Sequence, residues 1–418
     1  MARGKLPLGI QNFEELRKGG YLYADKTDMV WQIANGDKYN FLSRPRRFGK
    51  SLLVSTLQCY FEGKKELFEG LKIMDLEKDW VKRPVIHFSM NLGGSDAESL
   101  YHYLDDTLTK YEEIYGKRNT EATLSNRFTG IIERAYRQSG VQIAVLVDEY
   151  DAPLQHSYLT ERHDKCRNLY RDFFTGLKDY GSCIKCVFLT GITKFTQISL
   201  FSVLNTLSNI SFYNCYATIC GLTKEEILEN LKDELQALAA QKKWDINQTM
   251  HELKDMYDGY HFSESMLGVY NPYSVICALK EKRLRPYWIA SGATEMLPKI
   301  LTNFEKDVET LDGSLIDMDY IETADISKDN PKLFLYQSGY LTIKGVMGES
   351  YRLGFPNREV KKALLELVVP NMLNANKEET ENAIQGLKQH FMLGNLEEGV
   401  ICLKQLVAGT PYSTQKKE

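Results

Sequence analysis

The stretch Arg44-Pro-Arg-Arg-Phe-Gly-Lys-Ser51 decides the fold. Its last three residues complete the pattern G-x-x-x-x-G-K-[ST], in which a loop between a strand and a helix holds phosphate groups. The residues before it, Tyr39–Ser43, are predicted to form a strand, and Ser51–Phe61 a helix. Backbone N–H groups at the start of such a helix attract phosphate. This stretch therefore predicts a nucleotide-binding site.

The pattern of this loop predicts which residues contact the nucleotide. Lys50 would neutralise the β- and γ-phosphates and the Ser51 hydroxyl would hold Mg²⁺. Arg44 stands where the pattern has glycine, and it is strained if the position needs a positive φ. The alternative is a chance strand–glycine–helix turn with surface arginines. We expect contacts with the nucleotide from Arg46, Arg47, Phe48, Gly49, Lys50, Ser51 and Leu52.

A second motif is the apolar run Ile143–Val147, which ends in Asp148 and Glu149. Asp148 would hold Mg²⁺ at the carboxyl end of a strand, where open α/β sheets bind ligands. Glu149 would polarise an attacking water, as a positioned carboxylate can. The alternative is an acidic turn after a strand. The order of the two motifs predicts ATP and Mg²⁺ as ligands, with Glu149 and Lys50 as catalytic residues.

The next apolar strand, Val187–Thr190, also ends in polar residues. A polar side chain that senses the γ-phosphate belongs at this position in many nucleotide hydrolases. Thr190 is the first candidate for such a sensor, and Thr193 or Lys194 the second. A strand that runs into a capped loop explains the same residues, so both interpretations stay open.

Strands alternate with helices in the first half of the chain, which predicts a parallel α/β sheet with flanking helices. The further strands expected are Val85–Met90, Ile143–Asp148 and Ile184–Thr190, and the further helices are Ala97–Tyr115, Leu124–Gln138 and Arg162–Lys178. The fold class is thus α/β, with the parallel sheet of a P-loop nucleotide hydrolase.

Helices dominate after residue 221. Thr223 and Glu226 form a capping box that opens a helix to about Gln241, and Asn271-Pro272 opens another. A third is expected near Thr294–Phe304, followed by two strands, Leu333–Lys344 and Ser350–Gly354, joined by a turn with glycine. The predicted division is a core over 1–220, a helical lid over 221–310, a winged-helix or hairpin region over 311–360 and a helical segment over 361–418.

Composition excludes several classes of protein. The 418 residues are 43% hydrophobic and 26% charged, which is typical of a globular protein and excludes general disorder. The net charge of −4 shows no basic excess for nucleic acid. No apolar segment reaches the roughly 20 residues of a membrane helix, and Met1–Gly20 is no signal peptide, so a cytoplasmic location is expected. Cys183 and Cys186 fall on opposite faces of a strand, which favours buried thiols over a metal site.

The sequence resembles a bacterial AAA-ATPase-like family whose members often carry a C-terminal PD-(D/E)XK nuclease-like domain. The resemblance implies a P-loop core of AAA+/STAND type followed by a helical lid. It also suits Arg44, because the family has the form Arg-Pro-Arg-Arg here. The matching stretches are Leu8–Arg17, Tyr23–Thr27, Arg44–Ser51, Val147–Pro153, Thr190–Lys194, Tyr257–Phe262, Tyr270–Ser274, Tyr287–Gly292 and Leu353–Val360.

The nuclease-like domain is not expected in these 418 residues. It would need an Asp and an apolar strand ending in Glu-x-Lys, which together hold a metal and activate water. Glu359-Val-Lys361 has that spacing but follows Asn-Arg on a predicted helix, and the chain reaches Glu418 without an Asp-bearing strand partner. We therefore expect no nuclease activity.

The sequence thus predicts an ATP-binding switch that hydrolyses ATP, with a protein partner or a second copy of the chain as its target. One alternative is a non-catalytic nucleotide-binding interaction module. Another is the ATPase part of a DNA-acting effector, for which the basic run Lys280–Arg285 gives weak support. A small-molecule kinase is a further alternative, which the Asp148-Glu149 pair disfavours. The stretch Tyr257–Tyr260 is interpreted as a helix C-cap rather than a nucleotide sensor.

Overall fold

The computed structural model describes residues 4–195, 207–288, 311–324 and 331–364, with single positions at 297, 382, 385, 386, 389 and 395. The chain divides into two compact units, Met1–Arg358 and Glu359–Glu418. In the second unit, residues 359–364 are helical, as expected around Glu359-Val-Lys361. The rest of the predicted helical segment lies outside the described stretches.

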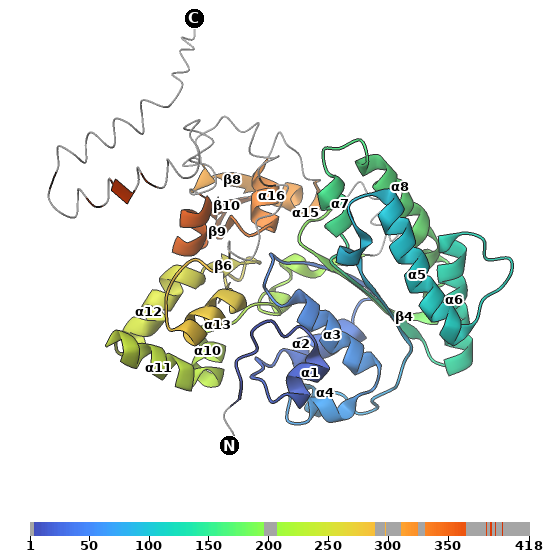
Figure 1. Ribbon diagram of the computed structural model, residues 1–418, viewed down its shortest axis with the longest axis horizontal. Coiled ribbons are helices and arrows are strands. Elements are labelled where there is room, and N and C mark those ends of the chain that lie inside the picture. The colour runs from blue at the N-terminus through green and yellow to red at the C-terminus, as the bar shows by residue number, and fades with distance from the viewer. Residues whose placement is uncertain are drawn as a thin grey trace, which may run out of the picture. The chain divides into compact units, whose positions relative to one another are not determined.

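A five-stranded parallel sheet forms the centre of the first unit (Figure 1). Its strand order is β2-β3-β4-β1-β5, so β4 lies between β1 and β3, with Leu42 opposite Thr190 and Val147 opposite Leu189. Every residue of β3 is buried, because helices cover both faces of the sheet. The fold class is as predicted. The strands are β1 (Tyr39–Ser43), β2 (Val85–Ser89), β3 (Ile143–Asp148), β4 (Ile184–Gly191) and β5 (Ser208–Asn209).

Helices lie on both faces of this sheet. α3 (Lys50–Phe61) packs on one face, with α1 (Phe13–Lys18), α2 (Thr27–Asn35) and α4 (Ile73–Leu76) around it (Figure 1). The opposite face carries α5 (Ala97–Tyr115), α6 (Leu124–Ser139) and α8 (His163–Phe174), with α7 (Ala152–Ser157) following β3. Short 3₁₀ turns are η1 (Lys65–Phe68), η2 (Met90–Gly93), η3 (Thr175–Lys178), η4 (Gly181–Cys183), η5 (Ile210–Phe212) and η6 (Asn214–Tyr216).

Four helices with a core of their own follow: α10 (Lys224–Asn230), α11 (Lys232–Lys242), α12 (Ile246–Tyr257) and α13 (Pro272–Glu281). The predicted capping box is present, and the Asn271 side chain caps α13. The single helix predicted to Gln241 is instead two helices, which meet at Leu231. The predicted helix Thr294–Phe304 lies outside the described residues, apart from position 297.

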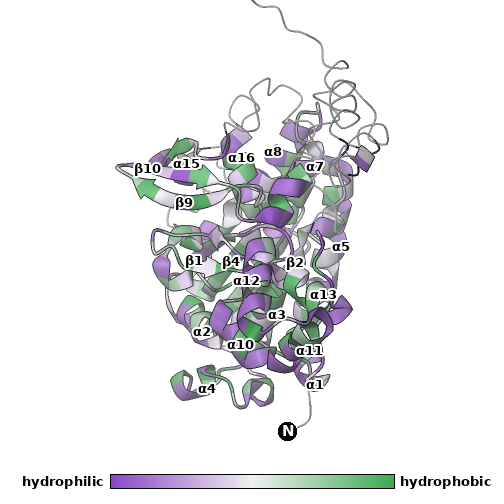
Figure 2. Ribbon diagram, turned by 90° about the vertical axis from the view of Figure 1, so that its left-hand side faces the viewer, coloured by the Kyte–Doolittle hydropathy of each residue, from purple (hydrophilic) through white to green (hydrophobic). Residues whose placement is uncertain are grey.

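A three-stranded antiparallel sheet of order β8-β10-β9 comes next, beside α15 and α16 (Figure 2). The prediction of a strand from Leu333 was wrong, since the first half of that stretch is helix α16. Nearly every side chain of α16 is buried, and a short apolar run does not by itself distinguish a buried helix from a strand. The elements are β8 (Leu315–Asp317), α15 (Met318–Thr323), α16 (Pro331–Gln337), β9 (Thr342–Met347) and β10 (Ser350–Gly354).

Three connections hold these parts around the phosphate loop. Lys26, at the start of α2, pairs with Glu226 of the capping box at 2.5 Å. The Gly221 N–H donates to the Phe48 carbonyl at 3.1 Å. The short hairpin of β6 (Tyr260–His261) and β7 (Gly268–Val269) meets β9, where the His261 N–H donates to Thr342 Oγ1 at 2.8 Å. The division into four domains remains a prediction.

Candidate nucleotide-binding site

The loop that follows β1 turns into α3 through two residues with left-handed backbone. Gly49 has φ +94° and Arg47 has φ +68°, whereas Arg44 is not among the residues with positive φ. The strain considered for Arg44 is therefore absent. No side chain caps α3 within the described structure, so the N–H groups of its first turn are available to an anion.

Arg44 is buried and structural. Its guanidinium donates to the carbonyls of Ser43, Ser211 and Tyr216 at 2.8, 2.9 and 2.9 Å. It also lies over the Phe262 ring, 4.2 Å from the centroid. Arg44 thus ties the end of β1 to the segment around η5 and η6 and to the hairpin of β6 and β7.

Lys50 is folded back onto its own loop. Its Nζ donates to the carbonyls of Arg44 and Pro45, both at 3.0 Å. Burial lowers the pKa of the Lys50 ammonium, while the charges of Glu149, Asp148 and Asp151 act in the opposite direction. Phosphate oxygens placed on the loop would compete with these two carbonyls for the same ammonium protons, because charged acceptors form the stronger bonds.

The acidic end of β3 supplies two different carboxylates. Asp148 is buried, and its Oδ1 has no hydrogen-bond partner among the described residues. Glu149 has φ +49° and lines a cavity with Lys50 and Ser51. Burial, and then the charge of Asp148, raises the pKa of the Glu149 carboxyl, against the effect of Lys50.

Asp151 organises the turn after β4. One carboxylate oxygen, Oδ2, accepts the backbone N–H groups of Ile192 and Thr193 at 3.0 and 2.7 Å. The same oxygen accepts the Thr193 hydroxyl at 2.6 Å and the Gln155 amide at 2.5 Å. From the sequence, no role was assigned to Asp151, which lies within the stretch Val147–Pro153. Its position at the start of α7 gives it this role.

The three sensor candidates hold the turn after β4 in place. The Thr190 hydroxyl donates to the Leu42 carbonyl of β1 at 2.9 Å, and the Thr193 hydroxyl donates to Asp151. Lys194 Nζ donates to the Glu322 carbonyl at 2.5 Å. None of the three is among the described residues that line the cavity, whereas Ile192 is. The sensor role stays a prediction.

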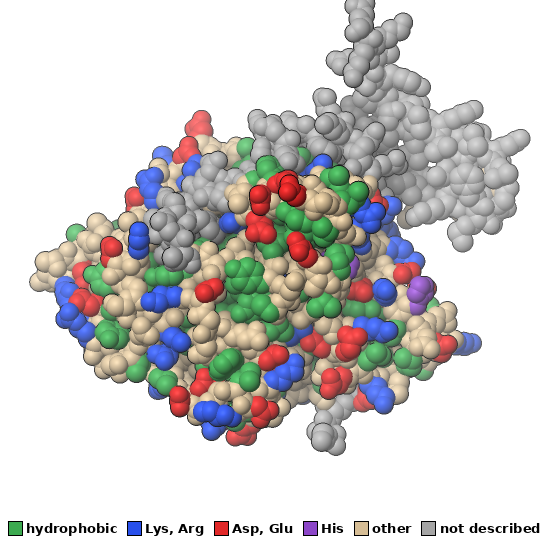
Figure 3. Space-filling view, turned by 180° about the vertical axis from the view of Figure 1, so that it is seen from behind, with side chains coloured by type: hydrophobic (Ala, Val, Ile, Leu, Met, Phe, Trp, Pro, Cys, Tyr) green, Lys and Arg blue, Asp and Glu red, His purple; other side chains and the backbone are tan. Residues whose placement is uncertain are grey.

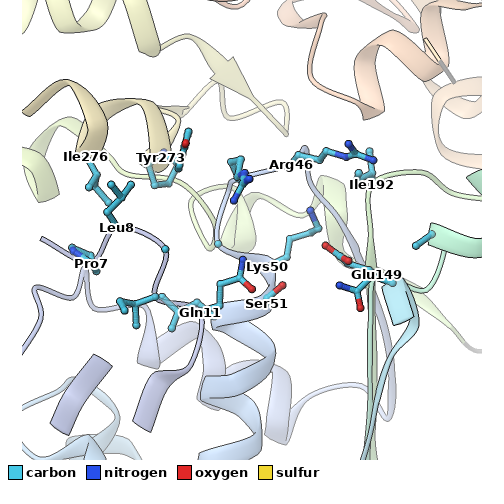
Figure 4. Close-up of a pocket in the computed structure, with 18 of the residues that line it drawn as sticks. Pro7, Leu8, Gln11, Arg46, Lys50, Ser51, Glu149, Ile192, Tyr273 and Ile276 are labelled. Carbon is cyan, nitrogen blue, oxygen red and sulfur yellow. The ribbon is translucent and has the colours of Figure 1, made fainter. Parts of the chain in front are cut away.

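A cavity of about 420 Å³ joins these groups (Figure 4). Its apolar end lies between the N-terminal segment and the start of α13, its middle is the phosphate loop, and its polar end lies beyond Glu149. The lining residues are Pro7, Leu8, Gly9, Ile10, Gln11, Arg46, Arg47, Gly49, Lys50, Ser51, Leu52, Asn91, Glu149, Asp151, Ala152, Gln155, His156, Ile192, Pro272, Tyr273 and Ile276.

Of the residues predicted to bind nucleotide, Phe48 and Asp148 do not line this cavity. Phe48 is buried against the rings of Tyr260 and Phe262 and supports the loop from behind. The apolar end was missed, although Leu8–Arg17 and Tyr270–Ser274 are among the stretches that carry the family resemblance. Those two stretches were the signal that could have found Leu8 and Tyr273.

The residues present fit a magnesium ion in one respect. Asp148 Oδ1 is a buried carboxylate oxygen without a partner in the described structure, and Ser51 lies in the first turn of α3. The described residues hold no cluster of three or more His, Cys, Asp or Glu that suits a metal ion. Mg²⁺ usually takes one or two protein ligands and completes its coordination shell with phosphates and water.

In this parallel sheet, the first strand leads through a phosphate loop into a helix, and acidic residues follow another strand. These features define a P-loop nucleotide-binding fold. The family described as Predicted AAA-ATPase, AAA-ATPase-like, matches residues 7–201. The chain is also 34% identical over 381 residues to an uncharacterized protein in the vnfD 5′ region of Azotobacter chroococcum mcd 1, over 88% of this chain and 70% of that protein.

The chain belongs to this AAA-ATPase-like family. The resemblance stated from its motifs is therefore confirmed, and membership implies nucleotide binding. Within the described ranges, every helix is too short or too polar to cross a membrane.

Proposed function

We propose that this chain binds ATP with Mg²⁺ in the cavity and hydrolyses it, as a switch. One observation carries the proposal. Lys50, at the start of α3, and Glu149, directly after β3, line the same cavity, which has an apolar end as well (Figure 4). The strand between them, β4, leaves about 10 Å between the loop strand and the acidic strand. The cavity of about 420 Å³ that Lys50 and Glu149 line would hold a phosphate group and a water there.

The apolar end suits a purine base. Leu8 comes from the N-terminal segment, and Tyr273 and Ile276 face it from α13 (Figure 4). The N-terminal segment is held by backbone hydrogen bonds, from the Lys5 N–H to the Gly20 carbonyl at 3.1 Å and from the Leu22 N–H to the Lys5 carbonyl at 2.9 Å. A base in this slot would therefore contact the sheet unit and the helical lid together.

That position gives the switch a physical basis. Leu8 and Tyr273 also pack against the hydrophobic core of α10–α13. A bound nucleotide would add contacts between the lid and the loop, and its loss would remove them. The free energy of binding would then favour one placement of the lid over others.

Ser51 and Asp148 would hold the magnesium ion. Bound there, the ion would neutralise charge on the β- and γ-phosphate oxygens. Lys50 would leave the carbonyls of Arg44 and Pro45 and donate to the same phosphates. The N–H groups at the start of α3 would complete the cradle.

Glu149 would orient the attacking water. Its carboxylate accepts a proton of the water, whose oxygen attacks the γ-phosphorus. The bond from the γ-phosphorus to the bridging oxygen breaks, and ADP and phosphate leave. The raised pKa of Glu149 makes its ionised form a stronger base than an exposed glutamate.

The test compares the parent with Lys50→Ala and Glu149→Gln, in Mg²⁺-dependent ATP binding and phosphate release. Lys65→Ala and Glu66→Gln are matched controls, because both residues are exposed on η1 and away from the cavity. We expect Lys50→Ala to lose binding. Glu149→Gln should bind ATP but release phosphate at least about 100-fold more slowly than the parent.

Other results would change the proposal. Binding without turnover in the parent would favour the non-catalytic nucleotide-binding module. Equal turnover in Glu149→Gln would remove that residue from the mechanism. A role on nucleic acid is the weaker alternative, since positive and negative side chains are interspersed on the face seen in Figure 3.

A further inference from the structure

The two neighbouring arginines of the phosphate loop take different directions. Arg47, with its left-handed backbone, places its guanidinium over the ring of Tyr273, 4.9 Å from the centroid. It therefore faces the lid helix α13. Arg46 is half-buried, and its side chain extends toward Ile192, on the same side of the loop as Glu149 and the end of Lys50 (Figure 4).

The backbone of Arg46 is held from outside the loop. The Trp288 indole N–H donates to the Arg46 carbonyl at 3.2 Å. Trp288 is buried and packs edge-on against Tyr340, with ring centroids 5.0 Å apart. Pro45 lies against Gly339, where a β-carbon would come within 2.7 Å of the proline ring. The side chain of Arg46 thus starts from a fixed point, which limits the entropy lost when its guanidinium binds.

The position of Arg46 has an electrostatic consequence at the hydrolytic end. Its positive charge acts on Glu149 in the same sense as that of Lys50, favouring the ionised carboxylate. Two cations from one loop therefore act on the carboxylate that would hold the water. Arg47, by contrast, acts on Tyr273 at the other end of the loop.

Phosphoryl transfer needs positive charge at this end. Negative charge spreads over the γ-phosphate oxygens and the leaving oxygen in the transition state, and an arginine supplied there raises the rate by about 10³ to 10⁵. Lys50 supplies a point charge. A guanidinium adds a planar fork that binds two phosphate oxygens at once.

We propose that Arg46 is the arginine finger of this protein, supplied in cis by the phosphate loop, where it contacts the γ-phosphate and needs no arginine from a second copy. The proposal rests on the proposed function, because it assigns a role in the same hydrolysis. Arg47 takes a separate role, in which its stacking on Tyr273 holds the lid helix near the bound nucleotide.

The experiment uses the full chain with Arg46→Ala, Arg46→Lys and Arg47→Ala, and with Lys65→Ala as the exposed control. Two quantities are measured: phosphate release per chain, and the affinities for ADP and for ADP with aluminium fluoride by calorimetry. Aluminium fluoride imitates the γ-phosphoryl group in transfer. Measurable ADP binding, with or without a lowered affinity, shows that each variant is folded.

We expect Arg46→Ala to lower turnover about 10³-fold. It should lose most of the preference for ADP with aluminium fluoride over ADP alone, while ADP binds as in the parent. Arg46→Lys should restore little, because a point charge lacks the fork. Arg47→Ala should weaken ADP and ADP with aluminium fluoride by the same factor. Turnover per chain in the parent should not change on dilution to the monomer.

Three results would overturn the assignment. Arg46→Ala could keep both the turnover and the preference for ADP with aluminium fluoride. The parent's turnover per chain could rise with protein concentration, or appear only in an oligomer while the monomer binds ATP without turnover, either of which would place the arginine in trans. A parent that does not bind ATP with Mg²⁺ would refute the proposed function, and this assignment with it.

Discussion

Replacing Arg44 by glycine tests whether the buried Arg44 side chain stabilises the fold. The substitution Arg44→Gly restores the residue that the phosphate-loop pattern has at this position. From the pattern alone, we would expect the variant to be at least as stable as the parent. The structure predicts the opposite. Arg44 lacks the positive φ that would favour glycine, and its buried guanidinium donates to two carbonyls of a distant segment of the chain, around η5 and η6.

The magnitude follows from those contacts. The buried Ser211 carbonyl would lose the Arg44 donor at a cost of about 1–3 kcal/mol, whereas the Tyr216 carbonyl would keep the Ile219 N–H and lose about 1 kcal/mol. The cation–π contact with Phe262 adds about 1 kcal/mol. Arg44 is a buried charge that pairs with no carboxylate among the described residues, and its removal offsets part of this cost. We therefore expect the free energy of unfolding to fall by about 3 kcal/mol.

Equilibrium urea unfolding, followed by tryptophan fluorescence, measures this change. Arg47→Gly is the matched control, because the same substitution three residues later falls on a backbone with φ +68° that glycine adopts without strain. It should change the stability by about 1 kcal/mol or less. The reasoning is refuted if Arg44→Gly is as stable as the parent, or if Arg47→Gly is the more damaging of the two.

Two further predictions concern the acidic residues. Burial raises the pKa of Glu149 in the folded state above its ordinary value of 4.5. The ionised carboxylate therefore opposes folding, and stability is lost as pH rises from 4.5 through the folded-state pKa. Glu149→Gln should raise the thermal midpoint at pH 7 and should give no gain below pH 4.5. A lower midpoint at pH 7 would contradict this sign. Asp151→Asn should lower the free energy of unfolding by about 3 kcal/mol, since one buried carboxylate oxygen accepts four donors. Asp164→Asn, on an exposed turn of α8, is its control in the same urea titration, and an equal loss in both would remove the special role of Asp151.

The contacts that leave the cavity lead toward the three-stranded sheet. The backbone N–H of Lys194 donates to Gln337 of α16 at 3.2 Å, and its Nζ reaches Glu322 of α15. Trp288 and Gly339 touch the loop itself. These contacts connect the phosphate loop and the turn after β4 to α15 and α16, so the proposed switch would transmit the state of its nucleotide through this part of the chain.

The sequence by itself determined the elements of the sheet unit and the family, and it predicted the chemistry of the two motifs. Fully apolar strands such as Ile143–Val147, helix caps such as Thr223 and Asn271, and the Gly49-Lys50-Ser51 ending are local patterns. Local patterns are readable because steric and hydrogen-bonding preferences act between residues a few positions apart. The family followed from the order of such stretches along the chain.

Only the tertiary structure decided where the side chains of Arg44, Arg46 and Arg47 lie. Their residue type is the same, and the direction of each side chain depends on backbone torsion and on partners more than 160 residues away, such as Ser211, Tyr216 and Trp288. The apolar end of the cavity is likewise formed by the N-terminal segment and α13, which meet only after the chain has folded. The helix α16 was misread for the same reason, because burial on all sides comes from neighbours that a local pattern does not contain.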